Sequence, residues 1–182
     1  MARPKFDYSL DYKNLDLRQK PQLYRVGKGE QWVLMVEPYK SEILPHWRFK
    51  NPKIAQKSSQ KIKELFYEYK KKWDFIWMDM ARKFIQMWYT RSRRYANHAG
   101  GRKYSDEDLE IPKKYDEIPD YWTERNRQHF IDTKTKKILP QEKDALTNEK
   151  AESARIFYWV YQEVKSDPEY MKMKKEWQDT HW

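Results

Sequence analysis

The sequence predicts a mostly helical α+β fold with a short N-terminal β element, a central helical hairpin and two C-terminal helices. Long segments carry apolar side chains at helical spacing, and a β-rich run stands near the N-terminus between turn signals. Aromatic residues make up 16% of the 182 residues. They supply a core to a chain whose mean hydropathy is -1.21. At this length we expect one domain, 1–182.

The β element is predicted from the run 32–36, which is rich in strand-forming residues and ends before Pro38. The glycines of 27–29 precede it. They match neither the dinucleotide fingerprint nor the phosphate-loop pattern, so we interpret them as a turn. A second extended segment is expected at 46–49, because Pro45 disfavours helical geometry in the residue before it.

The helical hairpin is the strongest structural prediction. Asn51 followed by proline is a typical helix start, and apolar positions continue at helical spacing over Pro52–Lys72. A second helix is predicted from Asp74 toward Tyr95 or His98. The link between them is very short, so we expect the two helices to pack as neighbours.

The C-terminal half begins with an interruption. Gly100–Gly101 ends the hairpin, and the following stretch, about 104–148, shows little periodicity and is predicted to be an irregular insertion. Asn148 is a plausible cap for a helix over Glu149–Lys165, and Pro168 begins a final helix.

The distribution of charge indicates a working surface. The net charge is +10, and between Met80 and Ser105 there is no acidic residue. The window contains seven basic residues: Arg82, Lys83, Arg91, Arg93, Arg94, Arg102 and Lys103. Such a concentration of one sign attracts phosphate, so DNA or RNA is the first partner to consider.

The predicted nucleic-acid-binding residues combine cations with rings. On a helix, Arg91, Arg94 and His98 share one face, and Tyr95 lies beside them for stacking on a base or sugar. The full predicted set is Arg91, Arg93, Arg94, Tyr95, His98, Arg102 and Lys103. We expect an accessory protein that binds the phosphate backbone without strong sequence preference.

Three other interpretations stay open. The arginines could form a solvated surface neutralised by acids that follow the window, namely Asp106, Glu107, Asp108 and Glu110. The basic face could instead be a protein–protein interaction module for an acidic protein. An enzyme acting on a phosphorylated or nucleotide substrate is the third, with Glu37, His46 and Arg48 near Arg94. The spacing assigns no reaction and no catalytic residue.

Several classes of site and location are disfavoured. The chain has no cysteine, so it can form neither a disulfide nor a thiolate metal site. Its four histidines show no metal-ligand spacing, and we expect no metal and no cofactor. No apolar run reaches membrane length and no secretory signal is visible. A cytoplasmic protein without a membrane partner is therefore expected.

Several long segments resemble one protein family. They are Lys5–Lys13, Leu23–Gln31, Val36–Phe49, Met78–Phe84 and Arg93–His98, and the likeness resumes from Lys150 to Tyr170. The chain is identified by them as a member of the family catalogued as domain of unknown function 4385, found in bacteria and phages. The resemblance implies no established activity.

The tryptophans form an anomaly within this resemblance. The chain has nine Trp and only four Gly. The family pattern carries glycine at the positions of Trp32, Trp73, Trp77 and Trp88. A gene whose UGA codons are read as glycine would show tryptophan at these positions when translated with a code that reads UGA as tryptophan. The hypothesis predicts UGA codons there.

Overall fold

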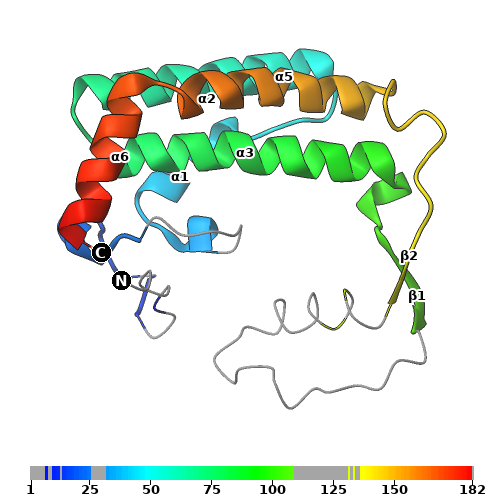
Figure 1. Ribbon diagram of the computed structural model, residues 1–182, viewed down its shortest axis with the longest axis horizontal. Helices are drawn as coiled ribbons and strands as arrows, with labels where there is room; N and C mark the ends of the chain where they lie inside the picture. The colour runs from blue at the N-terminus through cyan, green and yellow to red at the C-terminus, as the bar shows by residue number, and fades with distance from the viewer. Residues whose placement is uncertain are drawn as a thin grey trace.

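Three long helices form the body of the protein. The computed structural model describes residues 7, 10–12, 14–25, 32–108, 131, 133 and 136–181. Helices α2 (Pro52–Lys71), α3 (Phe75–Asn97) and α5 (Glu149–Lys165) pack side by side. The shorter α6 (Pro168–His181) lies across one end of them (Figure 1). The predicted mostly helical α+β class is confirmed.

The hairpin forms as the sequence predicts. The Asn51 side chain accepts a hydrogen bond from the backbone N–H of Ile54 at 2.9 Å and caps α2. The Asp74 side chain caps α3 through the N–H of Trp77 at 3.1 Å. Trp73, in the turn between the helices, has a φ of 55°, a backbone conformation that favours glycine.

The C-terminal helices also confirm their predictions. Asn148 caps α5 by accepting from the N–H of Ala151 at 2.9 Å. The same side chain donates from its amide nitrogen to the carbonyl oxygen of Ala96 at 3.0 Å. One residue therefore begins α5 and fastens it to the end of α3.

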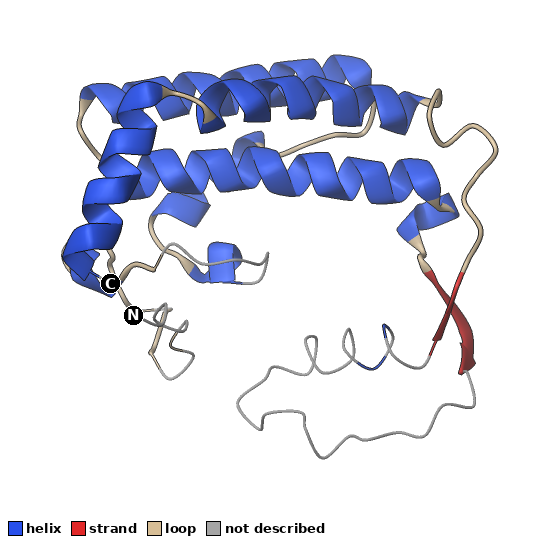
Figure 2. Cartoon of the chain, viewed as in Figure 1, coloured by secondary structure: helices blue, strands red, loops and turns tan. Residues whose placement is uncertain are grey.

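The sheet lies elsewhere than predicted. Its two antiparallel strands, β1 (Tyr104–Asp108) and β2 (Lys136–Ile138), project from the end of the bundle opposite α6 (Figure 2). Tyr104 is opposite Ile138 and Asp108 is opposite Lys136, with an irregularity between these pairs. Both strands fall within the predicted insertion 104–148, much of which lies outside the described residues.

The predicted N-terminal strand is wrong. Trp32–Met35 forms the 3₁₀ helix η2, and Val33 and Val36 are both buried. A strand needs a partner for its backbone hydrogen bonds, and no described segment offers one to this run. The run instead forms backbone hydrogen bonds within itself, as a 3₁₀ helix does. The glycine turn predicted at 27–29 lies outside the described residues.

Short helical segments make up the rest of the described N-terminal half. They are η1 (Pro21–Leu23), α1 (Tyr39–Ile43) and η3 (Leu44–His46). The extended segment predicted at 46–49 begins one residue late, since η3 takes in His46 and extended backbone starts at Trp47. The last short helix, η4 (Ala99–Gly101), follows α3.

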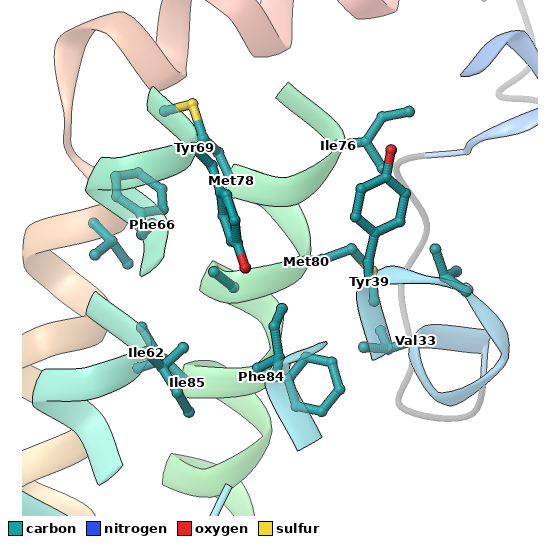
Figure 3. Close-up of a cluster of buried hydrophobic side chains, with 14 of the residues drawn as sticks. Val33, Tyr39, Ile62, Phe66, Tyr69, Ile76, Met78, Met80, Phe84 and Ile85 are labelled. Atoms are coloured by element: carbon teal, nitrogen blue, oxygen red, sulfur yellow. The ribbon is translucent and has the colours of Figure 1, made fainter. Parts of the chain in front are cut away.

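The core lies where α2, α3, α5, α6 and the N-terminal segments meet. Figure 3 shows Phe66 and Ile62 of α2 facing Met78 and Ile85 of α3, with Val33 and Tyr39 on the opposite side of α3. All of these side chains are nearly or fully buried. Because α3 is covered on several sides, its position is fixed along most of its length.

Candidate nucleic-acid interface

A row of aromatic rings lies between α3 and the segment that precedes α2. The Trp47 ring stacks on Trp88 at 3.9 Å, and Phe49 lies 4.3 Å from Trp88 and 5.4 Å from Tyr95 between ring centroids. The Trp47 indole N–H donates to the carbonyl oxygen of Phe84 at 3.1 Å. The segment is thereby held against α3.

Two cations lie over these rings. The Arg91 guanidinium is 5.6 Å from the centroids of both Trp47 and Trp88, and the Lys150 ammonium is 5.1 Å from Phe49. The Lys150 ammonium also donates to the Lys50 carbonyl oxygen. Cation–π contacts hold these long side chains against the protein. Positive charge and ring surface therefore lie together.

Tyr95 and Arg94 extend this surface toward η4. The Arg94 side chain donates to the carbonyl oxygen of Gly101 at 2.6 Å. A Cβ on Gly101 would stand 2.7 Å from a Tyr95 ring carbon, so only glycine fits against this ring. Tyr95 remains 38% exposed. The turn after α3 thus positions both side chains.

We call this surface the basic–aromatic face: Trp47, Phe49, Arg91, Arg94, Tyr95 and Lys150. Arg48 and Lys50 flank Phe49 in the chain and are exposed. Among the described residues, no acidic side chain pairs with Arg91, Arg94 or Lys150. The face can therefore attract an external anion.

Four of the predicted binding residues are not part of the basic–aromatic face: Arg93, His98, Arg102 and Lys103. Arg93 donates to the Ala145 carbonyl at 3.1 Å and to the Asn97 side chain at 2.7 Å, which fixes the loop before α5. His98 is buried between the end of α3 and the start of η4. Its predicted role in binding is not compatible with that burial.

Arg102 and Lys103 lie at the edge of this region. Arg102 pairs with Asp106 at 3.0 Å, so one of the acids proposed as internal partners does neutralise part of the window. Lys103 lies 5.4 Å from the Tyr104 ring and pairs with no acid of the described residues. Of the two, Lys103 alone keeps its charge available.

Arg82 and Lys83, counted in the acid-free window, do not contribute to its surface field. Both are buried and pair with Asp79, at 2.8 and 2.9 Å. The hydroxyls of Tyr24 and Tyr170 donate to the two oxygens of the same carboxylate, at 2.5 and 2.6 Å. These five residues form the Asp79 cluster, which joins the N-terminal segment and α6 to α3.

Burial and pairing oppose each other in the Asp79 cluster. Desolvation raises the pKa of Asp79, but the charges of Lys83 and Arg82 and the tyrosine hydrogen bonds outweigh it and hold that pKa well below its usual range. Desolvation lowers the pKa of Lys83 to about 8, against the opposing attraction of Asp79. The carboxylate is therefore the charged centre on which the cluster depends.

Among the described residues, no contact brings Glu37 together with His46, Arg48 or Arg94. The Glu37 carboxylate pairs with Lys40 and accepts from the Ser41 hydroxyl at 2.7 Å, which lowers the pKa of Glu37 even though desolvation acts to raise it. Glu37 lines a pocket of about 610 Å³ with Lys40, without His46, Arg48 or Arg94.

The described ranges contain no group of three or more His, Asp or Glu side chains placed to hold a metal ion. None of the helices in this part of the chain is both long enough and apolar enough to span a bilayer.

The comparison with protein families gives one result. The family model of the domain of unknown function DUF4385 matches residues 7–180. The chain belongs to this family. Neither a curated protein nor a solved structure matches the DUF4385 chain. Its function must therefore be argued from its own residues.

Sequence reasoning missed two parts of this region. Lys150 reaches Lys50, next to Phe49, across 100 positions of sequence, and no local pattern in this DUF4385 chain signals that contact. The Asp79 cluster did carry a signal, because Arg82 and Lys83 follow Asp79 by three and four residues, the spacing of helical ion pairs.

Proposed function

We propose that this protein is a cytoplasmic accessory protein that binds the phosphate backbone of DNA or RNA through the basic–aromatic face. One observation supports it above the others. Arg91, Arg94 and Lys150 lie with half-exposed rings and without acidic partners in the described part of the chain. Cations bind phosphate oxygens, and rings accept bases or sugars.

The arrangement favours binding without strong sequence preference. Arg91 and Lys150 are held by cation–π contacts, and Arg94 is held by a hydrogen bond to the Gly101 carbonyl oxygen. These side chains can therefore contact the phosphate backbone of a nucleic acid that lies over the face, but they do not extend far enough to contact its base edges. The exposed Arg48 and Lys50 add positive charge to the segment that carries Phe49. Backbone contacts position a nucleic acid and read no base sequence.

The test compares two variants of equal net charge. Arg91→Gln/Arg94→Gln/Lys150→Gln removes three charges from the face. Lys71→Gln/Lys165→Gln/Lys175→Gln removes three from exposed positions elsewhere. Fluorescence anisotropy with short labelled RNA and DNA at low salt measures the dissociation constants. We expect the face variant to bind at least about tenfold more weakly than the control variant, given the strength of phosphate contacts.

The outcomes separate this function from its alternatives. No binding of either nucleic acid by the unmodified protein at low salt would sink the proposal. Equal weakening in both variants would show that binding follows total charge and not the face. Recovery of an acidic protein partner, insensitive to nuclease and lost in the face variant alone, would favour the protein–protein module instead.

A further inference from the structure

A cleft of about 440 Å³ lies at the N-terminal end of α3, away from the basic–aromatic face. Its walls come from Arg18 and Pro21, from the turn between α2 and α3, and from the last turns of α6. In Figure 1 this is the end at which α6 crosses the bundle, opposite β1 and β2. Phe75, Ile76 and Met173 give the cleft buried apolar lining. Its volume suits a small ligand.

Stacked rings lead from the core to this cleft. The ring centroids of Tyr170 and Phe75 are 6.0 Å apart, with an angle of 19° between the ring planes. The corresponding values are 5.4 Å and 28° for Phe75 and Trp177, and 4.1 Å and 14° for Trp177 and His181. Tyr170 is fully buried, whereas Trp177 and His181 are half-buried and line the cleft. A flat aromatic ligand can add the next layer to such a stack.

Positive charge stands at the rim of the same cleft. The Arg18 guanidinium and the Lys72 ammonium lie 4.2 and 5.6 Å from the centroid of the Trp77 ring. One guanidinium nitrogen of Arg18 pairs with a carboxylate oxygen of Glu42 at 2.6 Å. Lys72 is exposed and pairs with no acid of the described residues. It is therefore available to an anionic group.

The acids of the rim are engaged. The Asp74 carboxylate accepts from the N–H of Trp77 at 3.1 Å as the cap of α3. Glu176 lies 3.9 Å from the Lys172 ammonium. The hydrogen bond orients the Asp74 carboxylate toward the helix end, whereas the exposed Glu176 pair is weak.

We propose that this cleft binds a small molecule in which a flat aromatic ring carries a phosphate, the chemistry of a nucleoside monophosphate. The ring lies against Trp177 and His181, and the phosphate faces Lys72 and the guanidinium of Arg18. The site does not depend on the proposed nucleic-acid function. Along α3, about 25 Å of helix separates position 74 from position 91.

Isothermal titration calorimetry with three probes tests the site. AMP carries ring and phosphate, adenosine the ring alone, and inorganic phosphate the anion alone. AMP is expected to bind most tightly. His181→Ala and Lys72→Gln should each weaken AMP binding about fivefold, through loss of a stacked ring and of a charged partner. Lys71→Gln, an exposed neighbour outside the cleft, should leave it unchanged.

Absence of AMP binding would overturn the proposal. It would also be overturned if AMP bound no better than adenosine or than phosphate, or if His181→Ala and Lys72→Gln left its affinity intact. The face variant with Arg91, Arg94 and Lys150 replaced should bind AMP normally. Loss of AMP binding there would place the nucleotide on the basic–aromatic face and contradict the cleft, whatever the oligonucleotide result.

Discussion

At the scale of single residues, Trp73 departs furthest from what its position requires. Its φ of 55° lies in the left-handed region, and its side chain is 67% exposed. Left-handed geometry costs a residue with a Cβ roughly 1 to 2 kcal/mol, and an exposed ring recovers little of that through packing. The position suits glycine, as the turn after a helix usually does.

Replacing Trp73 by glycine should therefore stabilise the protein. We expect Trp73→Gly to raise the free energy of unfolding by about 1 kcal/mol. Trp73→Ala removes the same ring but keeps a Cβ, so it should gain little. Urea denaturation of the three proteins measures the difference. Equal stability of the Gly and Ala variants would mean that the backbone conformation is not the cause.

The codon hypothesis for the tryptophans remains a separate prediction. It expects UGA at position 73 and at positions 32, 77 and 88. Reading the gene decides it, since UGG at Trp73, Trp77 and Trp88 contradicts it.

The Asp79 carboxylate should be the most costly single group to remove. Asp79→Asn leaves Arg82 and Lys83 buried without their counter-charge. Breaking a buried ion pair in this way costs about 3–5 kcal/mol. Asp79→Asn/Lys83→Met removes one orphaned cation and should be more stable than Asp79→Asn. Chemical denaturation measures both, and a double variant no more stable than the single one would contradict the electrostatic explanation.

The Asp79 carboxylate also makes the free energy of unfolding depend on pH in the acid range. The folded pKa of Asp79 lies well below its unfolded value of about 3.9, so its contribution is complete above that value. It is lost as pH falls further, toward the folded pKa. Unfolding free energies between pH 7 and pH 2 should fall more steeply below pH 4 in the unmodified protein than in Asp79→Asn. Parallel curves would contradict this.

At the scale of elements, the two asparagine caps perform different tasks. Asn51 caps α2 through its side-chain oxygen alone. Asn148 caps α5 with its oxygen and also donates its amide to the Ala96 carbonyl and to Asp144, at 3.0 and 3.3 Å. An aspartate could replace the first function but not the second.

Aspartate substitutions separate these tasks. Asn51→Asp should keep stability unchanged or raise it slightly, because a carboxylate suits a helix N-terminus. Asn148→Asp should cost about 1 kcal/mol or more, through the lost donation to Ala96 and the repulsion between the new carboxylate and Asp144. Thermal unfolding of both variants checks the contrast. Similar effects at the two sites would mean that Asn148 acts only as a cap.

The sequence predicted the elements whose causes are local. Caps at Asn51, Asp74 and Asn148 and the apolar spacing behind them define α2, α3 and α5, since each cause lies within a few residues of its effect. The run 32–36 was predicted wrongly because a strand depends on a partner. Its own residues favour β structure equally well whether that partner exists or not.

At the scale of the whole molecule, the structure brings only some of the predicted residues together, and their binding role stays a prediction. Arg91, Arg94 and Tyr95 lie together as the helix geometry required. His98 and Lys83 are both buried, and Lys83 contacts Tyr24 across 59 positions of sequence, which local spacing does not reveal. Lys150 joins the face only because α5 returns along α3. Long-range packing decided which cations are structural and which are exposed.

The central claim is that phosphates bind at the basic–aromatic face. The most direct measurement is the slope of log affinity against log salt for one single-stranded oligonucleotide, in the unmodified protein and in the two charge-matched triple variants. If Arg91, Arg94 and Lys150 each contact a phosphate, the slope of the face variant should be shallower by about 2. The Lys71/Lys165/Lys175 control should keep the full slope. Equal slopes in all three proteins would contradict the account.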